Sequence, residues 1–517
     1  MTATHQRTAP HLLGHVHGSR RPLWATDADL LRHSLHLGHV GSGRREAALS
    51  AAANAIGNGL GLLFVDTHGD GRALRDIRHY AQAAGREDDL QLINLGPGGD
   101  GDSHAGIFNP FSDLSIREIG DMLCELVLGS VDDPPSGALD ISATSRAGCF
   151  ARHYLRIAAE ILAELRDNGD ADLSLDFILS FLRPEHFLRL VAGPKEGRLD
   201  LTTAVRLRAE TMLDGHFGID LQALAEGREQ PPMTRADIQE LDDLLVGAIL
   251  PLLDSTGGAL ANGSRGLALG EAVRERQIVV LALPSLERCR ADLQLCRLIS
   301  RYILQELVHI QKEPPASDRP ARPFLTFLAD AEPFCGPALI ESLTIARAAG
   351  VGFVLSALDL FSLRRYTAGG GLDHQLLGQI GDVYVGRQEA EAAEAALSLL
   401  RRAGGGDATE IRRQLVDEDS HRPPSGAPRR APSLDLVRER METVRDVSAL
   451  TEGEVLASLG AHPGRIIKLR RFNVPRHIPF IGPCTLDDMA PRPGLTGAVQ
   501  GVRRAARRVV RKLWLAA

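Results

Sequence analysis

A glycine-rich segment, GHVGSGRR at residues 38–45, constrains the fold of this chain more than any other feature. It follows a short apolar run at 35–37 and precedes an alanine-rich run of helical composition at 46–56. Gly38, Gly41 and Gly43 have the spacing of the phosphate-binding loop, G-x-x-x-x-G-K-[S/T]. Such glycines let the backbone curl until its N–H groups point at phosphates, beside a helix N-terminus. The pattern predicts a P-loop, and a glycine turn without any ligand is the alternative.

The loop predicts ATP as the cofactor, but its last two positions depart from the motif. Arg44 stands where a lysine is expected, and Arg45 where a serine or threonine is expected. A planar guanidinium does not simply replace a compact ammonium at the β- and γ-phosphates. Arg45 has no acceptor oxygen for Mg²⁺ and repels a cation. We therefore expect a surviving phosphate cradle and a failing Mg²⁺ site, with a cofactor-binding set of Gly38, Val40, Gly41, Ser42, Gly43, Arg44 and Arg45.

The order of elements along the chain predicts an α/β fold. Apolar runs of buried-strand type at 62–66 and 90–95 are separated by a helical stretch at 72–84, which is typical of a parallel sheet. Helical segments then fill 116–250, and strand patterns return at 277–283, 324–328, 351–355 and 382–385. We divide the chain into a first nucleotide-domain part (1–111), an all-α insertion (112–265), a second nucleotide-domain part (266–404) and a C-terminal region (405–517).

Three further segments are described by composition. Residues 1–34 are expected to be an irregular lead-in, and 401–432, rich in glycine, proline and charge, a linker or loop. A small β-containing segment is expected at 455–472. Residues 495–517 lack acidic side chains and predict a basic amphipathic helix, suited to an anionic membrane surface, DNA phosphates or an acidic partner. A solvated helix packed on its own domain explains this pattern equally well.

Composition limits the class of protein and its compartment. The net charge of -7 argues against a generally basic nucleic-acid binder. Six scattered cysteines without a C-x-x-C pair favour free thiols in a reducing compartment. No signal peptide is visible, and no apolar run reaches the roughly 18 residues that span a bilayer. We expect a bacterial cytoplasmic protein, with the basic C-terminal helix as its candidate contact with the inner face of the inner membrane.

Several motifs together resemble the VirD4/TraD/TraG coupling proteins of type IV secretion and conjugation. Each motif is short, and their order and spacing over about residues 11–475 carry the resemblance. The family implies a RecA-like P-loop domain with an inserted all-α domain, assembled in hexameric rings that hydrolyse ATP and pass DNA or protein to a secretion channel. The motifs are PLWATDAD with Arg32 and His33, DTHGD at 66–70, GREDD at 85–89, FNP at 108–110, ALPSLE at 282–287 and LTEGE at 450–454.

The resemblance also assigns catalytic positions, and this chain departs from them. Asp330 matches the metal-positioning aspartate at the end of strand 324–328, while Ala331 replaces the catalytic glutamate. Glu332 follows one residue late, and on an extended chain it would point to the same side as Asp330. Leu358 replaces a glutamine that contacts the γ-phosphate or the attacking water. Asp330 and Glu332 are thus the candidate catalytic residues, and Asp330 is the candidate Mg²⁺ ligand.

Two hypotheses for function follow. In the first, the chain is a degenerate coupling-protein relative that recruits or positions DNA or protein substrate at a secretion or conjugation machine, alone or in a mixed ring with active relatives. In the second, it is an ATP-driven translocase that uses Arg44 and Glu332 in an unorthodox site. The missing hydroxyl and glutamine favour the first hypothesis, and the retained glycines and Asp330 keep the second open. Arg347 and Arg387 are candidate arginine fingers in a ring, although surface arginines are the simpler interpretation of both.

Overall fold

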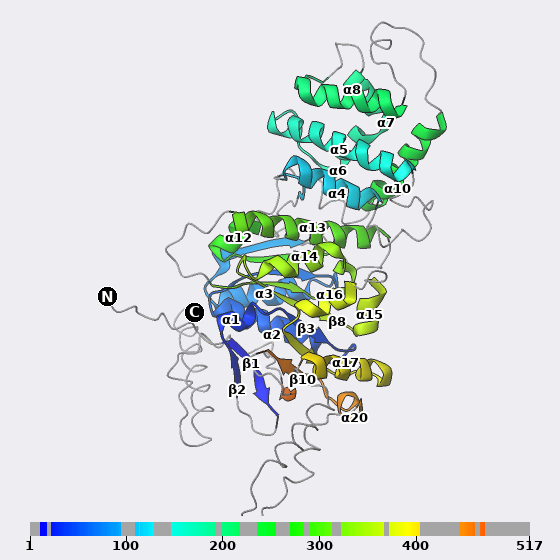
Figure 1. Ribbon diagram of the computed structural model, residues 1–517. Helices are drawn as coiled ribbons and strands as arrows, with labels where there is room; N and C mark the ends of the chain where they lie inside the picture. The colour runs from blue at the N-terminus through cyan, green and yellow to red at the C-terminus, as the bar shows by residue number, and fades with distance from the viewer. Residues whose placement is uncertain are drawn as a thin grey trace, which may run out of the picture.

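The structure is a computed structural model in which an α/β body carries a helical region at one end (Figure 1). It describes residues 11–17, 22–94, 109–112, 114–128, 146–192, 199–217, 235–254, 269–283, 290–312, 322–366, 372–403, 444–460 and 466–470. Among the helices formed by these residues, none is both long enough and apolar enough to cross a lipid bilayer. The motif residues 108 and 284–287, the linker and the basic C-terminal helix lie outside the described residues.

An 11-stranded sheet forms the centre of the body, in the order β2-β1-β11-β10-β9-β3-β8-β7-β4-β6-β5. The seven strands from β9 to β5 are parallel, as the strand–helix alternation predicts. The other four pair in antiparallel fashion and extend the same sheet. The strands are β1 (His11–Val16), β2 (Pro22–Ala25), β3 (Ser34–Leu37), β4 (Gly61–Asp66), β5 (Leu90–Asn94), β6 (Ile278–Ala282), β7 (Phe324–Leu328), β8 (Val351–Ala357), β9 (Asp382–Val385), β10 (Glu454–Leu459) and β11 (Ile466–Arg470).

Both faces of the central parallel strands β4, β6 and β7 are buried, which explains their nearly continuous apolar sequences. In β4, Leu62 and Phe64 face one core together with α2 and α3, while Leu63 and Val65 face the other core. The second core continues into the helical region. The helices of the body are α1 (Asp27–Leu30), α2 (Arg44–Gly57), α3 (Arg72–Ala83), α12 (Leu269–Glu275), α13 (Arg290–Lys312), α14 (Pro337–Ala346), α15 (Leu360–Tyr366), α16 (Leu372–Gln379), α17 (Ala390–Ala403) and α20 (Val444–Ser448), with single 3₁₀ turns at Glu87–Asp89 and Glu332–Phe334.

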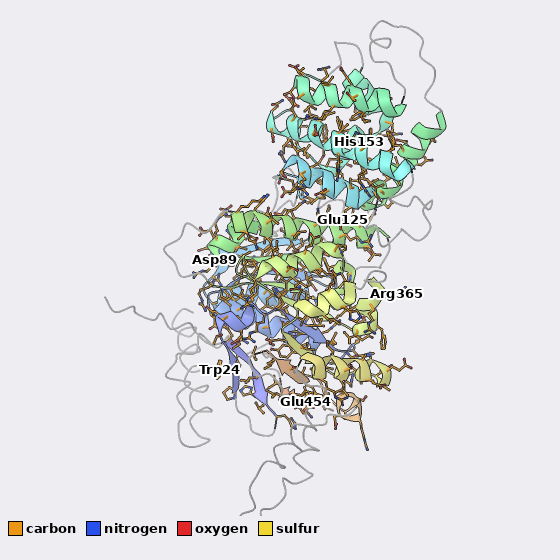
Figure 2. The ribbon with its side chains drawn as sticks, in the orientation of Figure 1. Trp24, Asp89, Glu125, His153, Arg365 and Glu454 are labelled. Carbon is orange, nitrogen blue, oxygen red and sulfur yellow. The ribbon has the colours of Figure 1, made fainter. Side chains whose placement is uncertain are left out.

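The described residues between 116 and 254 form helices and short connections, and this helical region lies on α13 of the body (Figure 1). At this seam Arg301 of α13 contacts Asp121 at 3.2 Å, and its Nε lies 3.9 Å from the Glu125 carboxylate (Figure 2). Burial raises the pKa of Glu125 above its ordinary value. The apolar core nevertheless runs through the seam, so the helical region is joined to the body by packing as well as by charge. Its helices are α4 (Ile116–Leu128), α5 (Arg146–Asp167), α6 (Leu175–Leu182), α7 (Pro184–Ala192), α8 (Thr203–Phe217) and α10 (Arg235–Asp254).

The expectation of an irregular lead-in at 1–34 is wrong for its described part. The chain forms β1, β2 and α1 there, and β1 pairs with β11 of the C-terminal region. Trp24 pairs with Leu12 in this antiparallel ribbon (Figure 2). Both strands are only partly buried, so they lack the apolar runs that revealed the central strands. The C-terminal strands likewise belong to the main sheet, because β10 pairs with β9.

Candidate nucleotide site

The glycine-rich loop lies between β3 and the first turn of α2, as the sequence predicted. Gly43 caps α2 with φ 82°, a left-handed conformation that favours glycine. A Cβ at this position would also lie 2.8 Å from the backbone nitrogen of Gly453, whose N–H donates to the Ser42 carbonyl at 3.0 Å. The turn at 451–453, part of the late motif, therefore closes tightly against the loop.

Neighbouring strand ends hold the rest of the loop in place. The Gly38 N–H donates to the carbonyl oxygens of Ala357 and Leu358 after β8, and the His39 N–H donates to the Arg387 carbonyl after β9. In the hydrogen bonds among the described residues, no acceptor is found for the N–H groups of Gly41 or Gly43. Together with the first turn of α2, these amides are suited to hold phosphate oxygens.

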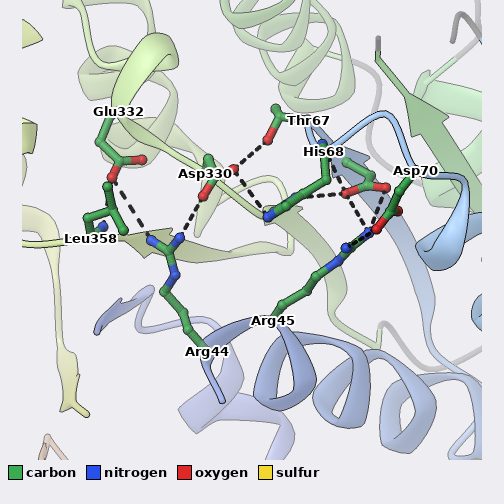
Figure 3. A network of polar contacts seen from close by, with 9 residues as sticks. Arg44, Arg45, Thr67, His68, Asp70, Asp330, Glu332 and Leu358 are labelled. Atoms are coloured by element: carbon green, nitrogen blue, oxygen red, sulfur yellow. Dashed lines mark hydrogen bonds and ion pairs between the residues drawn. The ribbon is translucent and has the colours of Figure 1, made fainter. Parts of the chain in front are cut away.

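Arg44 reaches across the site to the end of β7. Its Nη2 donates to the Asp330 Oδ1 at 2.7 Å, and its Nη1 lies 3.9 Å from the Glu332 Oε1 (Figure 3). The Arg44 side chain is only 12 % exposed. The residue that stands in the lysine position is thus bound to the carboxylate that would position a metal ion.

Arg45 is held by two aspartates of the D-T-H-G-D motif. Its Nη1 and Nη2 donate to the two carboxylate oxygens of Asp70, both at 2.6 Å, and Nη2 also contacts Asp66 at 3.2 Å. Burial alone would lower the pKa of Arg45, but the bonds to Asp70 and the charge of Asp66 raise it above its ordinary value. The same bonds hold the pKa of Asp70 well below its usual range. Arg45 therefore keeps its positive charge, which the carboxylates of Asp70 and Asp66 balance.

The second oxygen of Asp330 is also engaged. The Thr67 hydroxyl donates to the Asp330 Oδ2 at 2.7 Å, and the His68 Nε2 lies 3.6 Å from the same oxygen (Figure 3). The His68 Nδ1 lies 3.1 Å from the Asp66 Oδ1, so this histidine bridges the two aspartates. The sequence alone placed Thr67 and His68 in the D-T-H-G-D motif but assigned neither of them a role in the site. Their position directly after β4, beside β7 in the sheet, is the signal that could have placed them near Asp330.

Glu332 departs from the extended geometry that the sequence suggested. It begins a 3₁₀ turn, is 1 % exposed, and accepts a hydrogen bond on Oε1 from the Leu358 N–H at 2.7 Å. Burial raises its pKa above the ordinary value. The turn therefore swings the carboxylate towards Arg44 and the end of β8. Its Oε2 is buried and has no hydrogen-bond partner in the described part of the chain.

Two residues after β9 also belong to this region. The Gln388 side chain is buried and donates to the Leu358 carbonyl at 2.8 Å, so an amide lies beside the leucine that replaces the expected glutamine. The exposed Arg387 lies near the loop, since a Cβ at Gly41 would be 3.4 Å from its Nη2. Arg347 follows α14 and precedes β8, which places it at the opposite edge of the sheet from the loop.

The charges of the site decide which ligand fits. The open amides of the loop fit a phosphate group. A Mg²⁺ ion does not fit, because the hydroxyl position holds a guanidinium and both oxygens of Asp330 already have partners. In the described part of the chain, no group of three or more histidine, cysteine or acidic side chains is arranged to hold a metal ion. Four carboxyl groups, of Asp66, Asp70, Asp330 and Glu332, face the two guanidinium groups of Arg44 and Arg45.

Comparison with known proteins agrees with the motifs. No family model matches the chain. The type 4 coupling protein DotL of Legionella pneumophila is 24% identical over 282 residues, which cover 52% of this chain and 35% of DotL. The chain thus matches about a third of the length of that curated relative.

Solved structures of another coupling protein share the fold. The unbound conjugative coupling protein TrwB has a TM-score of 0.54 at 14% identity, covering 93% of this chain and 91% of the TrwB chain. TrwB with a non-hydrolysable ATP analogue has a TM-score of 0.53 at 15% identity, covering 92% of each chain. TrwB with ADP and Mg²⁺ has a TM-score of 0.53 at 15% identity, covering 89% of each chain. These likenesses confirm the predicted RecA-like α/β fold. In sequence, about half of this chain is similar to a type 4 coupling protein, and its fold is similar to that of the coupling protein TrwB.

Proposed function

We propose that this chain recruits or positions DNA or protein substrate at a type IV secretion or conjugation machine, with little or no ATP hydrolysis of its own. The similarity to a type 4 coupling protein supports a role in such a machine. The TrwB structures with an ATP analogue and with ADP and Mg²⁺ support the proposal that this site derives from a nucleotide-binding site. The loop amides keep that site able to accept phosphate.

The Arg44–Asp330 ion pair is the observation that carries the proposal of lost hydrolysis. In a working phosphoryl-transfer site, charge stabilisation and positioning supply most of the catalysis. Here the lysine, the hydroxyl, the catalytic glutamate and the glutamine are replaced by Arg44, Arg45, Ala331 and Leu358. Removal of one such group costs about 10²–10³ in rate, although losses within one site do not simply multiply.

The proposed partners follow from the same relationship. Coupling proteins of this family form rings, so we propose a homo-oligomeric or mixed ring in which this chain completes an interface of an active relative. We place it in the bacterial cytoplasm, at the inner face of the inner membrane when it is docked. The basic segment 495–517 is the proposed contact with that membrane, and it lies outside the described residues.

The second candidate function is an active ATP-driven translocase, and the position of Glu332 favours it. The 3₁₀ turn brings this buried carboxylate within 3.9 Å of Arg44, so an acid does lie beside the loop despite Ala331. In that case Glu332 would orient the attacking water and Arg44 would stabilise the γ-phosphate. The bond from the Leu358 N–H to Glu332 and the Arg44–Asp330 pair would first have to open.

ATP turnover by the purified protein tests the proposal. The assay is run with Mg²⁺, with and without single-stranded DNA, on the wild type and on the variants Arg44→Ala and Glu332→Ala. Arg72→Ala is the control, because Arg72 pairs with Glu46 rather than with the carboxylates around Asp330. We expect no turnover above the buffer background in any sample. Turnover that both site variants abolish and the control retains would establish the translocase instead.

A further inference from the structure

We propose, on the basis of the function above, that this site binds the phosphate chain of a nucleotide without a divalent cation, and that Asp330 restrains the arginine that would bind it. In the structure Arg44 is paired with Asp330. A phosphate on the loop would compete with Asp330 for the same guanidinium. Asp330 would then oppose nucleotide binding, which is the reverse of the role that a metal-positioning aspartate has.

The cation-free mode follows from what replaces the metal. Guanidinium groups bind phosphate oxygens through several N–H donors and stay charged at any physiological pH. Arg44 and Arg45 begin α2, directly after the amides of Gly41 and Gly43 that have no acceptor among the described residues. Because Asp70 and Asp66 neutralise Arg45, Arg44 is the group that can supply the positive charge that Mg²⁺ supplies elsewhere, once it leaves Asp330.

Unpartnered buried atoms mark the place of the missing ligand. Buried polar atoms almost always have a hydrogen-bond partner, so exceptions that gather in one place require an explanation. The Arg44 Nη1 and the Ser42 Oγ are both buried without a hydrogen-bond partner in the described part of the chain, and both can donate to a phosphate oxygen. Ser42 is 3 % exposed. A site that is complete without a ligand would not leave two such donors around one loop.

The two arginines differ in how firmly they are held, which identifies Arg44 as the mobile one. Arg45 makes two bonds of 2.6 Å to Asp70 and a further contact with buried Asp66. Arg44 makes one hydrogen bond, to Asp330, and its Nη1 has only the 3.9 Å ion pair with Glu332 among the described residues. Opening the Arg44–Asp330 pair therefore costs less than opening the contacts of Arg45. The neutral variant Asp330→Asn weakens this restraint, and it also alters the contacts of Asp330 with Thr67 and His68.

Calorimetric titration with ATP in buffer containing EDTA tests the inference. We expect measurable binding by the wild type, and binding about tenfold tighter by Asp330→Asn, as expected when one charge-assisted bond no longer competes. The gain should vanish in the double variant Arg44→Ala/Asp330→Asn. Asp70→Asn is the matched control: it removes the same charge from the same site but leaves Arg44 on Asp330. Because the Asp70 side chain is 47% exposed and solvent screens its charge, we expect a gain of only about twofold.

Three results would overturn the inference: binding that requires Mg²⁺, Asp330→Asn binding no tighter than the wild type, or a gain that persists without Arg44. Circular dichroism verifies that each variant is folded, and Asp330→Ala replaces the amide variant if that one does not fold. The same samples are assayed for turnover with Mg²⁺. ATP turnover by the wild type would contradict the proposed loss of hydrolysis but would not decide the role of Asp330. The titration decides the role of Asp330 and does not depend on whether ATP is hydrolysed.

Discussion

Replacing Arg45 with alanine should destabilise the protein more than the loss of an ordinary surface ion pair. Arg45 neutralises Asp66, whose side chain is fully buried at the end of β4. In the variant, the Asp66 carboxylate keeps, among the described residues, only its contacts with His68, at 3.1 Å for Nδ1 and 3.4 Å for the backbone N–H. Breaking a buried ion pair from one side costs about 3–5 kcal/mol. Because His68 remains and Asp70 is 47% exposed, we expect a loss of about 3 kcal/mol.

Urea unfolding at pH 7, followed by far-UV circular dichroism, measures this loss in the free energy of unfolding. Arg72→Ala is the matched control, because it removes an arginine that pairs with Glu46 at 3.0 Å in the same domain. The Arg72 and Glu46 side chains are 25% and 30% exposed, so the control should lose less than about 1 kcal/mol. The reasoning about Asp66 is refuted if the two variants lose the same amount.

Two further predictions concern the same region. Gly43→Ala should lower the free energy of unfolding by about 1–3 kcal/mol, which is more than we expect for Gly71→Ala. Both glycines have a positive φ, but only a Cβ at Gly43 would meet the Gly453 backbone. Urea unfolding of the two variants measures the difference, and a larger loss for Gly71→Ala would contradict the prediction. The folded-state pKa of Asp70 is depressed, so its stabilising contribution is present above its unfolded pKa of about 3.9 and is lost as pH falls through the folded value. The stability difference between the wild type and Asp70→Asn should therefore be constant from pH 7 to about 5 and shrink below about 3.9, and a difference that grows on acidification would sink this assignment.

The nucleotide loop and the central strands were predictable because their signals are local. The spacing of Gly38, Gly41 and Gly43 identifies a phosphate loop without knowledge of any distant residue. A strand such as β7, with the sequence FLTFL, is almost wholly apolar because both of its faces are buried. The edge ribbon of β1 and β2 was missed for the opposite reason, since its strands are only partly buried.

The position of Glu332 could not be predicted from sequence spacing. The extended geometry assumed for residues 330–332 would place this carboxylate on the side of Asp330. The chain instead bends into a 3₁₀ turn directly after β7, and the carboxylate accepts a hydrogen bond from the Leu358 N–H of the neighbouring strand end. A turn of this kind depends on the packing of its neighbours, which residue order does not reveal.

The sequence by itself determined that Arg44 and Arg45 replace the lysine and the hydroxyl residue of a P-loop, which is sufficient to predict a poor Mg²⁺ site. Only the tertiary structure decided what these arginines do. Arg44 and Asp330 are 286 positions apart, and they meet because parallel strands end at one edge of the sheet. A sequence gives the sign of each charge but not the residue that pairs with it. The fold decides the pairing, and here it places the two arginines that replace the lysine and the hydroxyl residue in a network of ion pairs with Asp330, Asp66 and Asp70.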